Sequence, residues 1–117
     1  MRHAKTIELL DSTLRDGAQG AGINFSVADK IEVLKALDRL GITFIEGGNP
    51  SGSKIDCEFF KQAKDISLKH SKLVAFGSTA KPGYFPENDC TLKALLEAGT
   101  EFVSIVGKAS LFLWSRC

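Results

Sequence analysis

The sequence lacks the hydrophobic runs and the charge imbalance that mark several classes of protein. No stretch of its 117 residues approaches the ~18 consecutive apolar residues of a membrane span, and the first dozen residues hold no signal-peptide core. Lys plus Arg total 15 and Asp plus Glu total 14, so the net charge is +1. Because a nucleic-acid or membrane-surface binder carries a basic face, we expect no nucleic-acid or membrane partner. We also expect the protein to be cytoplasmic.

Cysteine is also scarce, and it is widely spaced. The three cysteines are Cys57, Cys90 and Cys117. A disulfide framework or a zinc knuckle needs cysteine pairs at short spacing. We therefore expect reduced thiols with no structural role in cross-linking the chain.

What the sequence does have is apolar periodicity that alternates between strand and helix. From Val27 to Leu40 the apolar residues recur at three- and four-residue steps and lie on one helical face, which leaves Lys30 and Asp38 on the polar positions. Ser26 with Asp29 resembles a capping box at the start of this helix. The predicted strands are 6–10, 42–46, 72–78 and 101–107; the predicted helices are 27–40 with its C-cap at Gly41, roughly 56–70, and one capped by Asn88 or Asp89 that stops at Gly99.

This βαβαβαβ order predicts an α/β fold with a parallel sheet, without internal repeats or an interdomain linker. Polar residues follow the strands: Asp11, Arg15 and Asp16 the first, Glu46 the second, Ser78 and Thr79 the third, and Lys108 the fourth. In a parallel sheet all these points lie at the carboxyl edge, where barrels and open α/β sheets place their sites. The pattern predicts a functional site at that edge.

The loop at 11–25 is the most unusual segment. It is longer than the ~2–6 residues that usually join a strand to a helix, and long loops are often functional. Its carboxylates suit a hard cation such as Mg²⁺ or Mn²⁺, and Arg15 suits a carboxylate or a developing oxyanion. The alternative is a solvated loop in which Arg15 pairs with a neighbouring Asp.

Two glycine patterns offer other interpretations. GAQGAG at 17–22 has the glycines of a dinucleotide-binding loop in the wrong order, although Glu46 occupies the position of a ribose-binding acid. Residues 47–54 resemble a P-loop in which Ser and Lys are exchanged. A non-catalytic Rossmann-like nucleotide-binding module therefore stays open as an alternative.

The run DSTLRDGAQ at 11–19 closely resembles the signature of the metal-dependent acyl-CoA condensing enzymes and lyases, the family of the 2-isopropylmalate, homocitrate and citramalate synthases. IEGG at 45–48, KLVAFGST at 72–79 and LLEAGTEFVSIVGK at 95–108 are most similar to the citramalate synthase branch. The resemblance covers about 6–108, and the tail 109–117 does not fit the family pattern.

The resemblance implies a (β/α)₈ TIM barrel, of which 1–117 would be a partial domain, the N-terminal half. It implies condensation of acetyl-CoA with pyruvate to (R)-citramalate on the way to isoleucine, by a protein that is a homodimer at full length. The alternatives within the family are 2-isopropylmalate and homocitrate synthesis.

For the site, the resemblance implies that Asp16 binds a divalent metal, Mn²⁺ or Mg²⁺, and that Arg15 contacts the 2-oxo group and stabilises the oxyanion. Glu46 would be a second catalytic residue, orienting Arg15 or a water, and Gln19 and Thr79 would bind substrate. The family's His-x-His metal ligands are absent from this sequence. We therefore expect the 117-residue chain to be inactive and to bind metal weakly.

Overall fold

The structure is a computed structural model that describes residues 5–107. Lys108, Cys117 and the tail 109–117 lie outside the described residues. The predicted α/β fold is confirmed: four strands form one sheet in the order β1-β2-β3-β4, and every neighbouring pair is parallel. The elements are β1 Leu10–Asp11, η1 Gly17–Gln19, α1 Val27–Arg39, β2 Phe44–Gly48, α2 Lys54–Ala63, β3 Lys72–Ser78, η2 Pro86–Asn88, α3 Cys90–Glu97 and β4 Phe102–Val106.

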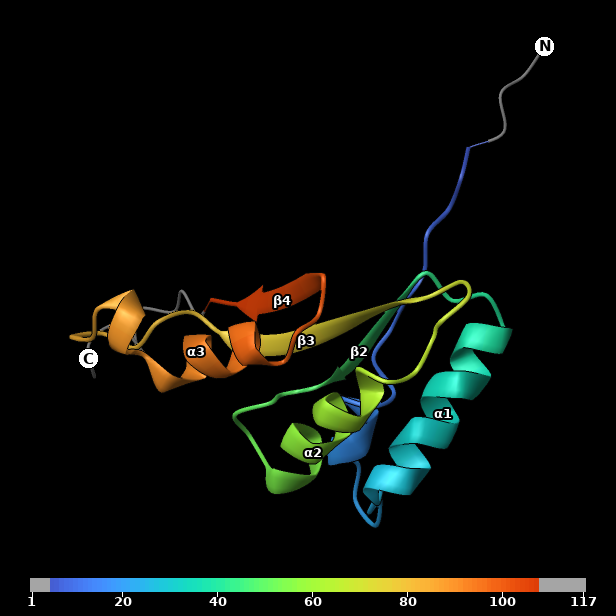
Figure 1. The fold of residues 1–117 in the computed structure, drawn as a ribbon, viewed down its shortest axis with the longest axis horizontal. Coiled ribbons are helices and arrows are strands. Elements are labelled where there is room, and N and C mark those ends of the chain that lie inside the picture. Colours follow the sequence, from blue (N-terminus) through green and yellow to red (C-terminus); the bar gives the residue numbers. More distant parts are fainter. Residues whose placement is uncertain (1–4, 108–117) are drawn as a thin grey trace.

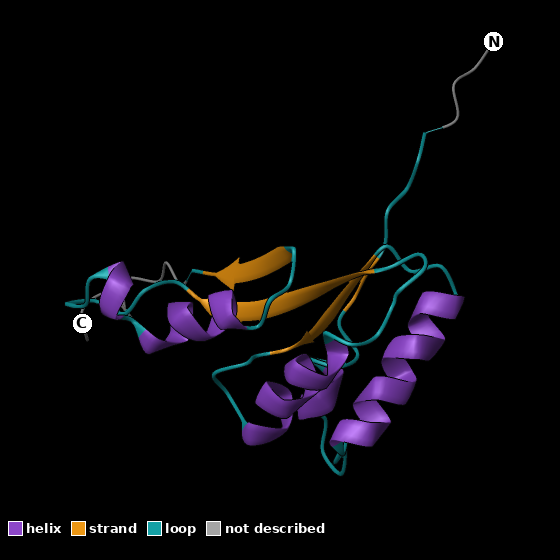
Figure 2. Cartoon of the chain, in the orientation of Figure 1, coloured by secondary structure: helices purple, strands orange, loops and turns teal. Residues whose placement is uncertain are grey.

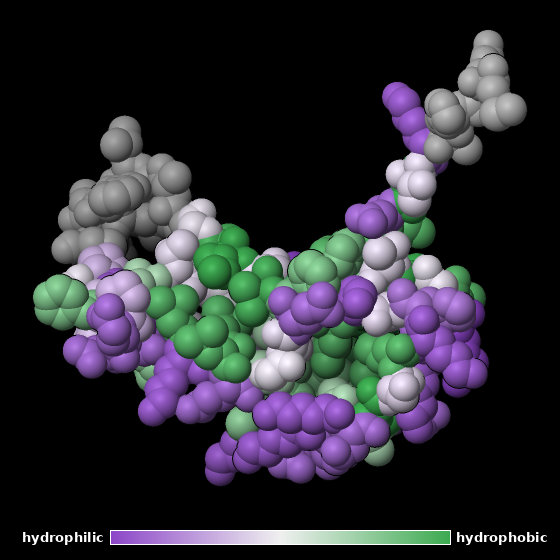
Figure 3. Space-filling model, turned by 45° about the horizontal axis from the view of Figure 1, so that its top comes forward, coloured by the Kyte–Doolittle hydropathy of each residue, from purple (hydrophilic) through white to green (hydrophobic). Residues whose placement is uncertain are grey.

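All three α-helices lie on the same face of the sheet and leave the other face open (Figures 1 and 2). α1 and α2 contact β2, and α3 contacts β3. One layer of helices outside a parallel sheet is the arrangement of the N-terminal half of a (β/α)₈ barrel, in which the open face lines the interior. The space-filling view agrees, since hydrophobic residues gather in the middle of the molecule and the outer helix surfaces are hydrophilic (Figure 3).

The core lies between the sheet and the helices. Two strand glycines allow the helices to approach closely: a Cβ at Gly47 would lie 2.6 Å from Cε1 of Phe59, and a Cβ at Gly77 would lie 2.6 Å from Cδ1 of Leu95. The buried cluster consists of Leu14, Ile31, Leu34, Ile45, Phe59, Phe60, Ala63, Ala75, Leu95 and Ala98.

The first predicted strand, 6–10, is wrong except at its end. β1 contains only Leu10 and Asp11, which pair with Phe44 and Ile45 of β2. Residues 5–9 are exposed, and among them Leu9 touches the sheet through its carbonyl, which accepts from the Phe44 N–H at 2.9 Å. Among the described strands β1 pairs with β2 alone, so it lies at an edge of the sheet.

The second predicted helix, 56–70, begins earlier and ends seven residues earlier, at Ala63. The last part of the predicted helix is held in a different conformation by Asp38, whose carboxylate accepts from the backbone N–H groups of Lys69, His70 and Ser71 at 2.8–2.9 Å. Burial alone would raise the pKa of Asp38, but these three donors outweigh it and lower the pKa to about 2.

Asp38 and Lys30 therefore do not belong to the polar face of α1, and that part of the prediction is wrong. Only 7% of Asp38 and 1% of Lys30 is exposed. Both have partners on elements that follow β2 in the chain, which α1 by itself does not reveal.

The helix ends follow the sequence signals. Ser26 and Asp29 form the predicted capping box, and Asp89 rather than Asn88 caps α3 by accepting from the N–H groups of Thr91 and Leu92. Gly41 and Gly99 have φ values of 82° and 72° at the ends of α1 and α3, where glycine is favoured.

The second strand begins and ends two residues later than predicted, so that Glu46 lies within β2 instead of at its end. The Ile42 N–H donates to the Leu37 carbonyl at 3.3 Å, so Ile42 belongs to the turn that follows α1. The third strand has the predicted bounds, and the fourth is one residue shorter at each end. Cys57 and Cys90 are free and exposed. No helix in the described part of the chain has the length and hydrophobicity to cross a membrane.

Candidate active site

The loop after β1 is a compact turn built on Ser12. The Ser12 carbonyl accepts from the N–H groups of Arg15, Asp16 and Gly17 at 3.1, 2.8 and 3.1 Å. Leu14 is completely buried in the core and fixes the turn to the body of the protein. The turn thereby holds Arg15 against the sheet, while the neighbouring Asp16 lies at the surface.

Arg15 meets Glu46 across the carboxyl edge of the sheet. Nη2 of Arg15 donates to Oε1 of Glu46 at 3.0 Å, and the guanidinium carbon lies 4.2 Å from the centre of the Phe76 ring. Glu46 is 2% exposed. Within the described residues, Nε of Arg15 and Oε2 of Glu46 are buried without a hydrogen-bond partner. The pair therefore contains one buried donor and one buried acceptor without a hydrogen bond, an arrangement that costs desolvation energy and is uncommon in folded proteins.

The strands explain why these groups converge. Glu46 on β2 pairs in register with Val74 on β3, and Phe76 follows two residues later on the same strand face. Side chains two apart on a strand share a face. Gly47 and Gly77, the next residues along, face α2 and α3, so Glu46 and Phe76 point to the open face of the sheet.

A cavity of about 370 Å³ lies between the 15–25 loop and the loop after β2. Arg15 and Gln19 contribute polar groups from the first loop, and Phe76 contributes an aromatic face from β3. The other lining residues are Leu14, Ala18, Ile23, Asn24, Phe25, Lys30, Asn49, Gly52, Ser53, Ile55 and Asp56.

The predicted site residues are thus only partly together. Arg15 and Glu46 are in contact, and Gln19 lines the same cavity as Arg15. The Asp16 side chain is 68% exposed, with Oδ1 3.7 Å from Nη1 of Arg15. Thr79 is exposed just beyond β3, where its N–H donates to the Val106 carbonyl at 3.1 Å, and it does not line the cavity that the described residues form.

The glycine run is not placed as a dinucleotide-binding loop requires. Residues 12–26 separate β1 from α1, and Gly17–Gln19 form a short 3-10 helix instead of the first turn of α1. Such a binding loop turns directly from its strand into the helix whose N-terminus receives the phosphates.

Comparison with known proteins assigns the family. The sequence model of the HMGL-like family matches residues 6–114, nearly the whole chain. The chain belongs to the HMGL-like family. The resemblance seen in DSTLRDGAQ is thereby confirmed, and the half-barrel sheet is the part of a TIM barrel that this match leads one to expect.

Curated relatives of this HMGL-like chain are similar over most of its length. It is 46% identical over 105 residues to the (R)-citramalate synthase of Streptomyces coelicolor, covering 89% of this chain and 20% of that protein. It is 48% identical over 101 residues to that of Synechocystis sp., covering 86% and 18%. A 2-isopropylmalate synthase of Lysinibacillus sphaericus is 54% identical over 52 residues, covering 44% and 10%. The chain therefore spans about a fifth of the length of the citramalate synthases that it matches.

The described residues of the HMGL-like chain contain no group of three or more His, Cys, Asp or Glu side chains that could bind a metal ion. The Asp11 carboxylate is engaged by the Thr13 N–H and hydroxyl at 2.9 and 3.1 Å. Asp16 presents an open, hard carboxylate beside Arg15 and fits a divalent cation as one ligand. The described part of the site supplies this single ligand and not a coordination shell.

Sequence reasoning missed three residues of the HMGL-like site: Phe76 under Arg15, and the pair of buried Lys30 and half-buried Asp56 at the cavity. A signal for Lys30 was present, because it lies three residues after Val27 and so on the apolar face of α1. Phe76 reads as an ordinary strand residue, and its contact with Arg15 joins segments 61 positions apart.

Proposed function

We propose that this chain forms the Arg15 side of the active site of a citramalate synthase, which condenses acetyl-CoA with pyruvate to give (R)-citramalate. The observation that carries the proposal is the buried pair of Arg15 and Glu46, which leaves one donor and one acceptor without partners in the described structure. The names of the relatives support the reaction. Because the chain spans about a fifth of their length, the whole reaction is proposed for the full-length protein.

Arg15 is the proposed electrophilic residue. Its guanidinium is held by Glu46 and Phe76, so its donors are oriented before a substrate arrives. Oriented donors stabilise the negative charge that develops on the pyruvate keto oxygen as carbon attacks, without reorganisation at that moment. Glu46 is proposed to set this orientation, Gln19 to bind substrate from the cavity wall and Thr79 to bind it from the end of β3.

The reaction needs groups beyond these. A base removes a proton from the acetyl methyl of the thioester, the carbon formed attacks the keto carbon, and the keto oxygen takes a proton to become the hydroxyl. Water then cleaves the thioester and releases the CoA thiol. Asp16 would contribute one ligand to Mn²⁺ or Mg²⁺, and such an ion, when bound, polarises the ketone. Dimerisation stays a prediction from the resemblance, and a cytoplasmic location stays a prediction from the sequence.

A chimera tests the proposal. Residues 6–108 would replace the matching segment of the Streptomyces coelicolor enzyme, and thiol release from acetyl-CoA would be followed with Mn²⁺ and either pyruvate or 2-oxoisovalerate. We expect turnover with pyruvate and its loss in Arg15→Met, whereas the isolated chain should show none. A preference for 2-oxoisovalerate would favour 2-isopropylmalate synthesis, the activity named for the Lysinibacillus relative. A folded chimera inactive with both acids would contradict the proposal.

A further inference from the structure

Lys30 is a buried cation whose place in the site the proposed reaction does not explain. It is 1% exposed, its Nζ donates to Oδ1 of Asp56, and Nζ lies 4.9 Å from the centre of the Phe59 ring. Burying an ion pair costs desolvation energy that the attraction between the charges only partly offsets, so an apolar pair of similar volume is often equally stable. Stability alone is therefore a weak reason for an ion pair here.

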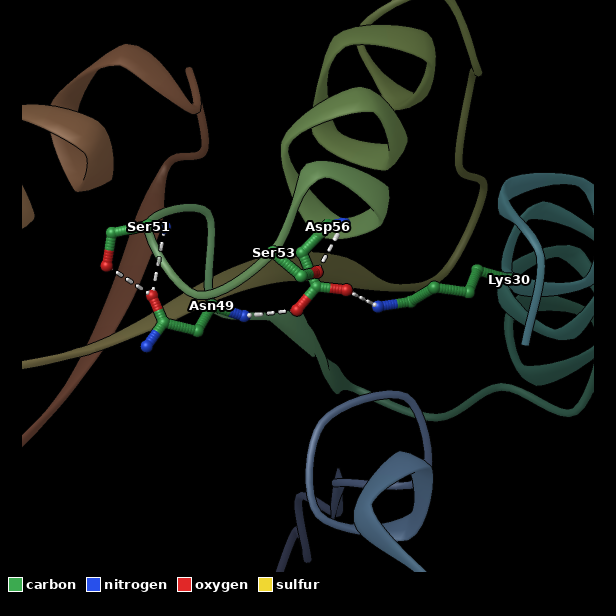
Figure 4. A network of polar contacts seen from close by, with 5 residues as sticks. All are labelled: Lys30, Asn49, Ser51, Ser53 and Asp56. Carbon is green, nitrogen blue, oxygen red and sulfur yellow. Dashed lines mark hydrogen bonds and ion pairs between the residues drawn. The ribbon is translucent and has the colours of Figure 1, made fainter. Parts of the chain in front are cut away.

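The second oxygen of Asp56 extends the pair to the loop after β2 (Figure 4). Oδ2 of Asp56 accepts from the Asn49 N–H at 3.0 Å, while the Asp56 N–H donates to Oγ of Ser53 at 3.0 Å. Asp56 thus holds both ends of the 49–53 loop, and Lys30 holds Asp56. Among the described residues, no other hydrogen bond connects α1 with this loop.

The 49–53 loop is otherwise built from its own groups. Oδ1 of Asn49 accepts from the N–H and the hydroxyl of Ser51 at 3.0 and 2.8 Å, and the Gly52 N–H donates to the Asn49 carbonyl at 2.9 Å. Before the loop, Gly48 has a φ of 136°, and a Cβ there would lie 2.6 Å from Oδ2 of Asp56 and 2.8 Å from Nζ of Lys30. A side chain at position 48 would therefore collide with the ion pair of Lys30 and Asp56.

This loop is one wall of the cavity that Arg15 and Gln19 line from the other side. Asn49, Gly52 and Ser53 all line the cavity, and so does Asp56. The width of the cavity therefore depends on where the Asn49 backbone is held.

We infer that Lys30 is a positioning residue: through Asp56 it holds the Asn49 backbone and so fixes the cavity wall that faces Arg15 and Gln19. Lys30 also lines the cavity, but its Nζ is engaged by Asp56. The choice of pyruvate as the cavity's ligand rests on the proposed function, but the positioning of the loop does not.

The test separates positioning from stability with the double variant Lys30→Met/Asp56→Leu. Replacing both charges leaves no unpaired buried ion, so the free energy of unfolding stays close to that of the parent chain. The Asn49 N–H nevertheless loses its acceptor. We expect amide hydrogen exchange at 49–53 to become about tenfold faster while exchange in β3 is unchanged, as the loss of one hydrogen bond to a charged acceptor allows. The matched control is Lys35→Met/Glu32→Leu, which removes an exposed pair separated by 3.5 Å and should change neither.

Two further measurements address the ligand. Pyruvate would be titrated into the chain while the amide signals of residues 15–19 and 49–53 are followed by NMR, and we expect about fivefold weaker binding in the double variant. In the chimera the same variant should raise KM for pyruvate and leave kcat within about twofold, because the pair belongs to the cavity wall that binds pyruvate and takes no part in the bond-forming step. The single variant Lys30→Arg keeps the positive charge, so its pyruvate affinity and KM should lie between those of the parent and those of the double variant.

The outcomes are distinct. Unchanged exchange at 49–53 in a stable double variant overturns the inference, and so does faster exchange with unchanged pyruvate affinity. If the parent chain binds no pyruvate and the chimera does not turn over, the proposed function fails, and the exchange experiment still decides whether the pair of Lys30 and Asp56 holds the loop.

Discussion

Arg15 and Glu46 join the first loop to the second strand through a single contact of 3.0 Å between Nη2 and Oε1. An arginine and a carboxylate commonly form two parallel hydrogen bonds. Here Nε of Arg15 and Oε2 of Glu46 are buried, and neither has a partner in the described structure. The pair therefore holds the guanidinium in place through one hydrogen bond and leaves a buried donor and a buried acceptor unpaired.

Removing the carboxylate should be costly. Glu46→Ala leaves the Arg15 charge, only 24% exposed, beside the Phe76 ring without its partner. We expect a loss of about 2–4 kcal/mol in the free energy of unfolding of the 117-residue chain, measured by urea denaturation. Glu46→Gln retains an acceptor for Nη2 and should lose less, about 1 kcal/mol.

The control for this prediction is Glu32→Ala on α1. Glu32 lies 3.5 Å from Lys35 in an exposed pair, and its side chain is 71% exposed. Such a pair should contribute less than about 0.5 kcal/mol. If Glu46→Ala and Glu32→Ala lowered the free energy of unfolding equally, the pair of Arg15 and Glu46 would contribute no more to stability than an exposed pair, which would contradict this prediction.

The sequence alone predicted that the site lies at the carboxyl edge of the sheet, but not the paths of the loops around it. β3 and α1 were predictable because their apolar patterns are long and regular, and DSTLRDGAQ marked the loop that carries Arg15. The paths of residues 64–71 and 49–53 were not predictable, because they depend on Asp38 and on the pair of Lys30 and Asp56. These contacts join residues 26–33 positions apart. The prediction of the first strand was wrong for a related reason, since strand pairing at the edge of a sheet depends on neighbouring strands more than on local propensity.

The pH dependence of stability should report Asp38. Its pKa is about 2 in the folded chain against an ordinary value of 3.8. A carboxyl group whose pKa is lowered by folding binds fewer protons in the folded state, so the stability that it contributes is present above pH ~4 and is lost as the pH falls through about 2. Thermal unfolding followed between pH 6 and pH 2 should show this loss.

The variant Asp38→Asn should lose that contribution at every pH. An amide offers one oxygen and turns its NH₂ toward a backbone N–H, so the three donors of Lys69, His70 and Ser71 cannot all be satisfied. We expect it to cost about 1–3 kcal/mol at pH 6 and to flatten the profile below pH ~4. The exposed Asp65 is the control, and a profile flattened as much by Asp65→Asn would rule out Asp38 as the cause.

Gly77 should not tolerate a side chain. A Cβ there would lie 2.6 Å from Cδ1 and 3.0 Å from Cγ of Leu95, so α3 would have to move away from β3. We expect Gly77→Ala to lower the free energy of unfolding by about 1–3 kcal/mol, as overpacking does. Adding Leu95→Val should recover part of the loss.

Gly17→Ala provides the comparison for Gly77. Its Cβ would meet Cγ2 of Thr13 at 3.6 Å, an ordinary contact, and its φ is not positive. The change in stability should stay within about 0.5 kcal/mol. If both alanine variants were tolerated equally, close approach of α3 to the sheet would not be the reason for glycine at 77.

Phe76 should be coupled energetically to Arg15, because its ring lies under the guanidinium at 4.2 Å. In a double-mutant cycle of Phe76→Leu and Arg15→Met, we expect a coupling energy of about 0.5–2 kcal/mol from urea denaturation. The comparison cycle uses Phe102→Leu, since Phe102 packs edge-to-face on Phe44 at 5.2 Å and should couple to Arg15 by less than about 0.3 kcal/mol. Coupling that is equal in the two cycles would mean that the ring acts through general packing of the sheet, and Arg15 would then owe its orientation to Glu46 alone.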